Sequence, residues 1–174
     1  MITIAYPGAD EYAPAFADYV ARIAEHEEIL ALLTSQLDHF PARLGHISEA
    51  RGDYRYALGK WSIKELVGHL SDTERIFAYR ALRVARGDAT PLPGFDEQAY
   101  AAEMRAGDRI LADLTAEWGD VRRASLALFR NLPAGAWQRR GIAGDRPISV
   151  RAAAYIIAGH LRHHLEVLET RYSA

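Results

Sequence analysis

Apolar residues that recur every three or four positions along four long segments constrain the fold of this chain more than any other feature of its sequence. In the third segment they run from Leu111 through Leu114, Trp118 and Val121 to Leu132. This spacing places them on one face of an α-helix, and that face must be buried against another element. The four predicted helices cover residues 24–47, 62–87, 108–132 and 149–172. No run of alternating apolar and polar residues predicts a strand, so we expect an all-α four-helix bundle.

Two of the predicted helices carry local signals at or near their ends. Ser62 and Glu65 have the spacing of a capping box, in which each side chain accepts a hydrogen bond from the other residue's backbone amide at the start of a helix. Pro41 is expected to kink the first helix or to end it near Phe40, because proline lacks an amide hydrogen.

Length and composition set limits on the class of protein. The 174 residues suit one domain over residues 1–174, with residues 1–23 as an N-terminal extension that holds a candidate short helix at 10–19. Lysine and arginine number 21 and aspartate and glutamate 23, a net charge of −2 that argues against a nucleic-acid partner. The chain has no cysteine, which excludes thiolate nucleophiles, disulfides and cysteine-ligated metal sites. No apolar run reaches the roughly 18 residues of a membrane span, and the start does not resemble a secretory signal. We therefore expect a cytoplasmic protein with no membrane partner.

Two histidines of the fourth predicted helix face inward together. At about 100° per residue, His164 and His160 fall about 20° and 60° from Ile157, on the apolar half of the helix, whereas His163 falls about 120° away. Residues four positions apart stack on one helix face, so His160 and His164 can share a metal ion. The alternative is a pair of boundary histidines that are hydrogen-bonded to carboxylates elsewhere in the bundle.

A third imidazole comes from the second predicted helix. His69 lies at the inner edge of the apolar face, as His160 does, and both histidines stand between a glycine and a leucine. Such a glycine can allow another backbone to approach closely. His26, near the start of the first predicted helix, is a possible fourth contributor. Three nitrogen ligands with an open position are typical of catalytic zinc, although imidazole also suits nickel, copper and iron.

Several motifs in this order resemble the DinB-like (YfiT-like) metalloproteins. The matching segments are Trp61-Ser62-Ile63-Lys64-Glu65, Gly68-His69-Leu70-Ser71-Asp72-Thr73-Glu74-Arg75, Pro91-Leu92-Pro93-Gly94-Phe95-Asp96 and Gly159-His160-Leu161-Arg162-His163-His164. The resemblance implies a four-helix bundle with up-down-down-up topology, a homodimer, and a metal site at His69, His160 and His164. It also implies a metal-dependent transferase that conjugates a low-molecular-weight thiol such as bacillithiol or mycothiol.

Three functional hypotheses follow from these observations. The first is a transferase in which a divalent ion, zinc or nickel, activates a low-molecular-weight thiol for attack on a small electrophile. The sulfur must come from the substrate, because the chain has no cysteine. The second is a metal-dependent hydrolase that uses a metal-bound hydroxide on the same histidines. The third is a non-enzymatic, stress-related dimeric metal-binding protein.

Three polar residues of the second predicted helix have two interpretations each. Asp72 or Glu74 can accept a hydrogen bond from a ligand imidazole and so orient it, or can form an ordinary ion pair with a neighbouring arginine. Arg80 can bind a carboxylate of a thiol cofactor, or can pair with an acidic residue of another helix.

Two further pairs of residues are assigned by position. Asp96 and Tyr100 lie in the connection 88–106, which is long for a helical bundle, and they can cover the mouth of the metal site. A crossover between parallel helices would explain the same length. Ile156 and Val167 lie away from the apolar face of the fourth predicted helix and are candidates for the dimer contact.

Overall fold

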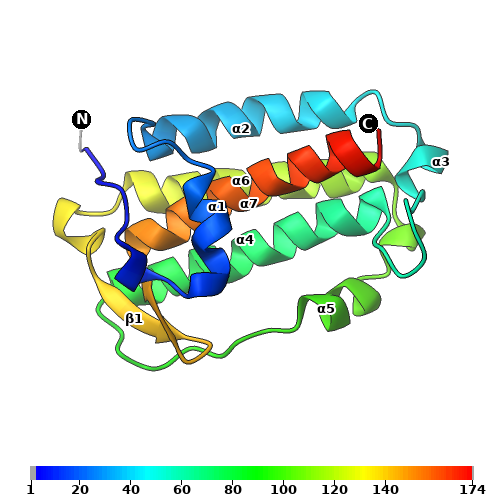
Figure 1. Cartoon of the computed structure of the whole chain (residues 1–174). Helices are drawn as coiled ribbons and strands as arrows, with labels where there is room; N and C mark the ends of the chain where they lie inside the picture. Colours follow the sequence, from blue (N-terminus) through cyan, green and yellow to red (C-terminus); the bar gives the residue numbers. More distant parts are fainter. Residues whose placement is uncertain (1–2, 174) are drawn as a thin grey trace.

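Four long helices form the bundle in the computed structural model, which describes residues 3–173. They are α2 (Ile29–Leu44), α4 (Ile63–Ala85), α6 (Leu111–Arg130) and α7 (Val150–Arg171). Figure 1 shows α2 and α7 running in one direction and α4 and α6 in the other. The predicted four-helix bundle and its up-down-down-up topology are therefore confirmed.

The order of the helices around the bundle explains the long connection between α4 and α6. Both α4 and α2 pack against α6 and α7, so α2 and α4 lie on opposite corners. Because α4 and α6 are parallel neighbours, the chain must return along the whole bundle between them. Residues 86–110 do so along one side and form the short helix α5 (Glu97–Glu103) on the way (Figure 1). A crossover was one of the two predicted explanations for this length.

The capping box predicted at Ser62 and Glu65 is confirmed. At the start of α4, the Glu65 amide donates to the Ser62 hydroxyl at 3.2 Å, and the Ser62 amide donates to the Glu65 carboxylate at 2.7 Å. The first helix begins at Ile29, five residues later than predicted, because the Glu28 carboxylate accepts the amide of Ala31 at 2.7 Å. The Glu28 side chain thereby caps α2, because the first amides of a helix have no carbonyl partner within the helix.

Helix α2 continues through Pro41 to Leu44 instead of ending near Phe40. Phe40 and Leu44 are both buried in the core, at 1% and 3% exposure. Their burial on either side of Pro41 keeps the last turn in place despite the missing amide hydrogen. The Gly45 amide closes this turn by donating to the Pro41 carbonyl at 3.0 Å.

The absence of strands was a wrong prediction. A β-hairpin of β1 (Arg140–Ala143) and β2 (Arg146–Ser149) precedes α7, with Ala143 paired to Arg146. Gly144 and Asp145 both have positive φ angles, 58° and 60°, as a two-residue type I′ turn requires. The strands have four residues each, too short for an alternating pattern to stand out.

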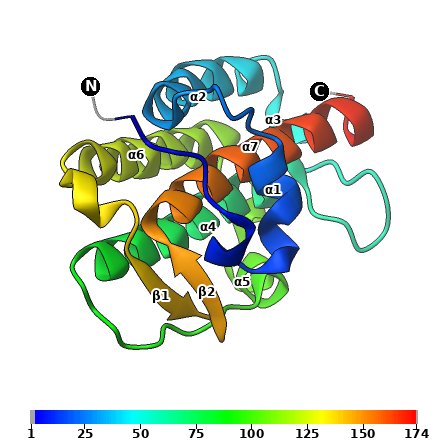
Figure 2. The same ribbon diagram turned by 60° about the vertical axis from the view of Figure 1, so that its left-hand side comes forward.

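The N-terminal segment wraps across α7. Two 3-10 turns at 9–11 and 14–16 lead into the short helix α1 (Ala17–Ala21), in place of the single helix predicted at 10–19. Figure 2 shows α1 and the hairpin on the same side of the bundle. This segment covers the face of α7 that was assigned to a dimer contact. Ile156 is 1% exposed and packs inside its own chain, so its assignment was wrong, whereas Val167 is half-buried.

A polar layer divides the apolar core into two clusters. On α2 and α6, the residues of one cluster precede the polar layer and those of the other follow it, whereas on α4 and α7 Leu70 and Leu161 lie among the polar residues. The cluster toward the hairpin includes Leu33 and Phe77, and the cluster toward the short helix α3 (Glu49–Gly52) includes Phe40 and Leu66. The buried polar side chains at the level between them include Gln36, His69, Thr73, Glu74, Arg122, His160 and His164.

Among the described residues, no helix combines the length and the hydropathy that a membrane span requires.

Candidate metal centre

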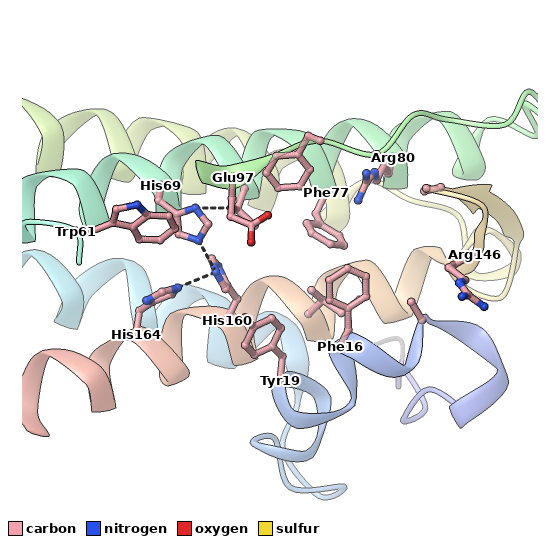
Figure 3. Close-up of a pocket in the computed structure, with 17 residues that line it drawn as sticks. Phe16, Tyr19, Trp61, His69, Phe77, Arg80, Glu97, Arg146, His160 and His164 are labelled. Carbon is pink, nitrogen blue, oxygen red and sulfur yellow. Dashed lines mark hydrogen bonds between the residues drawn. The ribbon is translucent and has the colours of Figure 1, made fainter. Parts of the chain in front are cut away.

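The structure brings the three predicted histidines together in the polar layer. His69 projects from α4 and His160 and His164 project from α7, with their rings converging (Figure 3). The Nε2 atom of His160 lies 3.0 Å from that of His69 and 2.9 Å from that of His164. One nitrogen from each residue can be chosen so that all three lie within 4.8 Å of one another.

This convergence fits a divalent metal ion. The Nε2 of a neutral imidazole carries either a proton or a lone pair, so His160 cannot satisfy both neighbouring nitrogens as a donor. A tetrahedral ion with metal–nitrogen distances of about 2.0–2.1 Å separates its ligand nitrogens by about 3.3 Å. The two separations from His160 Nε2, 3.0 and 2.9 Å, lie close to that value. The three converging imidazoles therefore fit a divalent ion.

Burial keeps the three imidazoles in the form that binds a metal. His69, His160 and His164 are 7%, 5% and 8% exposed. Burial lowers the pKa of His69 to about 4, and it holds the pKa values of His160 and His164 well below the usual range. All three rings are therefore neutral at neutral pH.

Asp72 and Glu74 follow the second of their two predicted interpretations, an ion pair with an arginine. Asp72 pairs with Arg75 at 3.5 Å, and Glu74 pairs with Arg122 at 2.8 Å, so neither carboxylate contacts a ligand ring. The Thr73 hydroxyl lies 3.4 Å from Nδ1 of His69 instead.

The three imidazoles are also surrounded by aromatic rings, and one of their own nitrogens has no hydrogen-bond partner among residues 3–173. The Trp61 and His69 ring centres are 4.4 Å apart, and the Tyr19 and His160 ring centres 5.1 Å apart. Nδ1 of His164 is buried and has no hydrogen-bond partner among residues 3–173. Three neutral ligands without a bonded carboxylate would leave the charge of a bound cation uncompensated, which favours an anionic fourth ligand.

The remaining histidines lie outside this group. His163 is half-buried beside Tyr19, with ring centres 5.4 Å apart, and is not among the converging residues. His26, a possible fourth contributor, is exposed in the segment before α2. His39 and His46 are also exposed. The structure thus separates His160 and His164 from the adjacent His163, as their positions around the helix predict.

The histidines open onto a cavity of about 320 Å³. Figure 3 shows the three histidines at one end, Phe16 and Phe77 in the middle, and Arg80 and Arg146 at the other end. A volume of this size suits a small organic molecule. The sequence did not identify Arg146 as a site residue, because the hairpin that carries it was not predicted.

Asp96 and Tyr100, the two residues of the long connection that were considered as a cover for the metal site, lie outside the cavity. Asp96 caps α5 by accepting the amides of Gln98 and Ala99 at 2.9 and 3.1 Å. Tyr100 packs beside Phe95 and is 47% exposed. Neither lines the cavity, so of the two predicted interpretations of this connection the structure supports the crossover and not a covering role for these residues.

Glu97 lines the cavity instead, and its carboxylate points inward (Figure 3). Burial and the nearby charge of Glu97 raise the pKa of Tyr19, which keeps that hydroxyl protonated. Aspartate at 96 is a recognisable helix cap, which places the start of α5 at Glu97, but no local signal shows that Glu97 faces the cavity.

Comparison with known proteins assigns the family. Residues 32–168 match the DinB superfamily. The fold is similar to that of YfiT from Bacillus subtilis, described as a probable metal-dependent hydrolase with an unusual four-helix bundle topology. The two chains are 19% identical, with a TM-score of 0.72 over 99% of this chain and 97% of that one. No curated protein matches the sequence. This chain belongs to the DinB superfamily, and its sequence resemblance to DinB-like (YfiT-like) proteins is confirmed.

Proposed function

We propose that this protein is a divalent-metal-dependent enzyme that acts on a small organic molecule in the cavity beside His69, His160 and His164. The observation that carries the proposal is the opening of the three-histidine group onto that cavity. A purely structural metal site in a bundle would be closed by protein ligands and packing. Here the histidines form one wall of a space large enough for a substrate.

The first candidate reaction is transfer of a low-molecular-weight thiol to a small electrophile. A divalent ion, zinc or nickel, would supply Lewis acidity that lowers the pKa of a coordinated thiol or water. The chain has no cysteine, so the nucleophilic sulfur belongs to the co-substrate. Phe16 and Phe77 provide an apolar surface for the electrophile.

The second candidate reaction is hydrolysis, and Glu97 is the observation that favours it. Water has a much higher pKa than a thiol and needs a base more. Glu97 can accept a proton at its carboxylate oxygens, because it faces the cavity that the histidines line. The Tyr19 hydroxyl, held protonated, can donate a hydrogen bond to a substrate oxygen. The YfiT structure, described as a probable hydrolase, is consistent with this candidate.

Metal content and activity test the proposal together. Protein purified without an affinity tag or added metal is analysed for zinc, nickel, copper and iron. The loaded protein is then tested with bacillithiol, mycothiol or cysteine plus an alkylating electrophile, and separately with nitrophenyl esters. We expect one ion per chain and an activity that chelation removes. Protein that binds no ion, or whose activity survives chelation, would contradict the proposal.

Glu97→Gln separates the two reactions. Hydrolysis should fall by about 10²–10⁴-fold, the range that general base catalysis contributes. Thiol transfer should change little, because a thiol ionises near pH 8.5 without help. Glu103→Gln is the matched control, since Glu103 is exposed on the same helix and does not line the cavity.

A further inference from the structure

Arg80 is a buried cation that has no acidic partner among residues 3–173. Its side chain extends from α4, and the residue is 5% exposed. Its one hydrogen bond within the described residues donates from a terminal nitrogen to the Pro93 carbonyl at 2.9 Å. The guanidinium also lies 5.0 Å from the ring centre of Phe77 and 5.8 Å from that of Phe95.

The other buried cations of the described chain have acidic partners. Arg122 pairs with Glu74 at 2.8 Å. Lys64 lies 3.2 Å from Glu49 and 3.1 Å from Asp53. Taking a charge out of water is costly unless an opposite charge or hydrogen bonds compensate it. Arg80 therefore lacks the acidic partner that Arg122 and Lys64 each have within the described residues.

The cavity is a place from which an anionic partner can reach Arg80. Arg80 lines the same space as the three histidines, at the opposite end. Arg146 of the hairpin lines that end too, and it makes no ion pair among residues 3–173. Two guanidinium groups at one end of a cavity give a local positive potential that the net charge of −2 conceals.

The separation of the two ends sets the length of a molecule that would occupy both. Arg80 lies eleven positions after His69 on α4, which corresponds to about 16 Å along the helix axis at about 1.5 Å per residue. Phe16 and Phe77 line the stretch between them, and Phe95 lines the cavity near Arg80. A molecule in this cavity is thus held at the histidines, along an apolar middle and at the arginines.

We propose that Arg80, assisted by Arg146, binds the anionic end of the substrate. The substrate class is an elongated molecule with its reacting group at the histidines, an aromatic or aliphatic middle, and a carboxylate or phosphate at the far end. This inference rests on the proposed function for the identity of the reacting end. The anion-binding end itself requires no metal. A planar guanidinium offers paired N–H donors to either anion.

The competing explanation is structural. Arg80 donates to the Pro93 carbonyl and so could serve only to hold the connection 86–110 against α4. A structural role predicts that Arg80 affects stability but gives no preference for a charged ligand. The two explanations therefore differ in ligand binding and not in folding.

Three matched probes test the anion-binding end in metal-free protein. They are 4-phenylbutyrate, 4-phenylbutyl phosphate and the neutral 4-phenylbutanol, with affinities measured by NMR titration at low salt. We expect at least one anion to bind about tenfold or more tightly than the alcohol, as a charged hydrogen bond implies. The stronger of the two anions identifies the end group as carboxylate or phosphate. A wild-type protein with no preference for either anion overturns the proposal, whatever the variants do.

Variants then assign the preference to Arg80. Arg80→Gln should lose the preference for the anion and keep its affinity for the alcohol, whereas Arg80→Lys should retain part of it. Arg86→Gln makes the same charge change at an exposed position at the end of α4 and should have no effect. An unchanged preference in folded Arg80→Gln contradicts the proposal. If Arg80→Gln does not fold, the Nε–H resonance of Arg80 in wild-type protein must shift on addition of the anion, and a resonance that does not shift has the same meaning.

A series of ligands of increasing length tests whether one molecule can reach both the histidines and Arg80. Zinc-loaded protein is titrated with alkyl hydroxamates of four to ten methylenes, with and without a terminal carboxylate. We expect the carboxylate to strengthen binding only in the longer members, and Arg80→Gln to remove that gain. A gain that is equal at every length places the anion elsewhere and overturns the shared-cavity arrangement. If the protein binds no zinc, the proposed function fails, while the metal-free probes still decide whether Arg80 binds an anion.

Discussion

The carbonyl oxygen of Tyr19 packs directly against Gly159, so closely that a β-carbon at position 159 would lie 1.9 Å from it. Gly159 precedes His160 on α7, and Tyr19 lines the cavity from α1. A backbone contact between α1 and α7 thus sets the position of one cavity wall relative to the candidate metal ligands. Only glycine allows the two backbones to approach this far.

Gly159→Ala should destabilise the protein by about 1–3 kcal/mol, the range for overpacking a filled site. A methyl group there would push α1 away from α7, because the obstructing atoms are backbone. Metal affinity should also fall, since His160 is the next residue. Urea unfolding and zinc titration measure the two effects.

Gly68→Ala is the matched substitution before the other histidine of the same motif. A β-carbon at position 68 would meet the Met104 sulfur at 2.0 Å, and no backbone atom lies that close. Methionine is flexible and can change rotamer, so this variant should lose less stability than Gly159→Ala. The expectation of a close backbone approach therefore holds at Gly159 and was wrong at Gly68. Equal losses in the two variants would show that the backbone contact has no special cost.

Removing one candidate ligand should reduce metal binding far more than removing its neighbour. His69→Ala, His160→Ala and His164→Ala should each lower zinc affinity by more than the about 10–100-fold that loss of an outer hydrogen-bond partner costs. His163→Ala is the control, because His163 lies outside the converging group. Competition with a chromogenic chelator measures the affinities. A His163→Ala protein that loses zinc while His164→Ala retains it would rule out this ligand set.

The metal-free protein should lose stability as the pH falls from about 6.5 to 4. In this window the unfolded chain protonates its histidines, with a usual pKa of about 6.5, while burial keeps the pKa of His69 at about 4. The unfolded state then binds more protons, so stability falls with pH, by about 3 kcal/mol for His69 alone by pH 4. His160 and His164 shift in the same direction and add to the loss.

Carboxylates act in a lower pH range. A hydrogen bond from Arg162 lowers the pKa of Glu27 to about 2, so its contribution to stability is lost only below its unfolded pKa near 4.5. Bound metal should protect the histidines and steepen the acid transition, because protons compete with the ion. Urea unfolding at several pH values, with and without zinc, checks this. A flat stability between pH 6.5 and 4.5 in metal-free protein is incompatible with three buried neutral histidines.

The buried ion pair between Glu74 and Arg122 should be costly to break. Glu74→Ala leaves the guanidinium buried without its carboxylate and should cost about 3–5 kcal/mol. Replacing both residues with methionine should cost much less, because no charge remains buried. Asp120→Ala is the control, since it breaks an exposed pair with Arg123 and should cost at most about 1 kcal/mol. Thermal unfolding by circular dichroism compares the four proteins, and a small loss in Glu74→Ala would contradict the estimate.

We propose that the protein is a homodimer, as its family resemblance implies. Light scattering at micromolar concentration should give twice the chain mass of 19.4 kDa. Val167 remains a candidate contact, and Leu82 on α4 is a second one because it is 37% exposed. Val167→Glu and Leu82→Glu test the two faces separately. A monomeric wild-type protein would exclude the dimer at that concentration.

Helical periodicity was sufficient to predict much of the fold and the three converging histidines. Period alone puts His160 and His164 on the apolar side of α7 and turns His163 away from it. Their burial follows, because a bundle has one interior and these residues share a helix face with Leu161. The same reasoning applied to Ile156 failed, because it treated α7 as though only the three other long helices could cover it.

Contacts between distant segments determined the rest. Whether Glu74 would pair with Arg75, Arg80 or Arg122 depended on which helix lay beside α4 at that level. Glu97 reaches the cavity because the crossover places α5 beside α4, and Arg146 reaches it because a hairpin of only four-residue strands forms before α7. Local spacing in the sequence specifies the face of a helix on which a residue lies. Only the packed structure determines what covers that face, and therefore that Arg80 is buried beside the cavity without an acidic partner among residues 3–173.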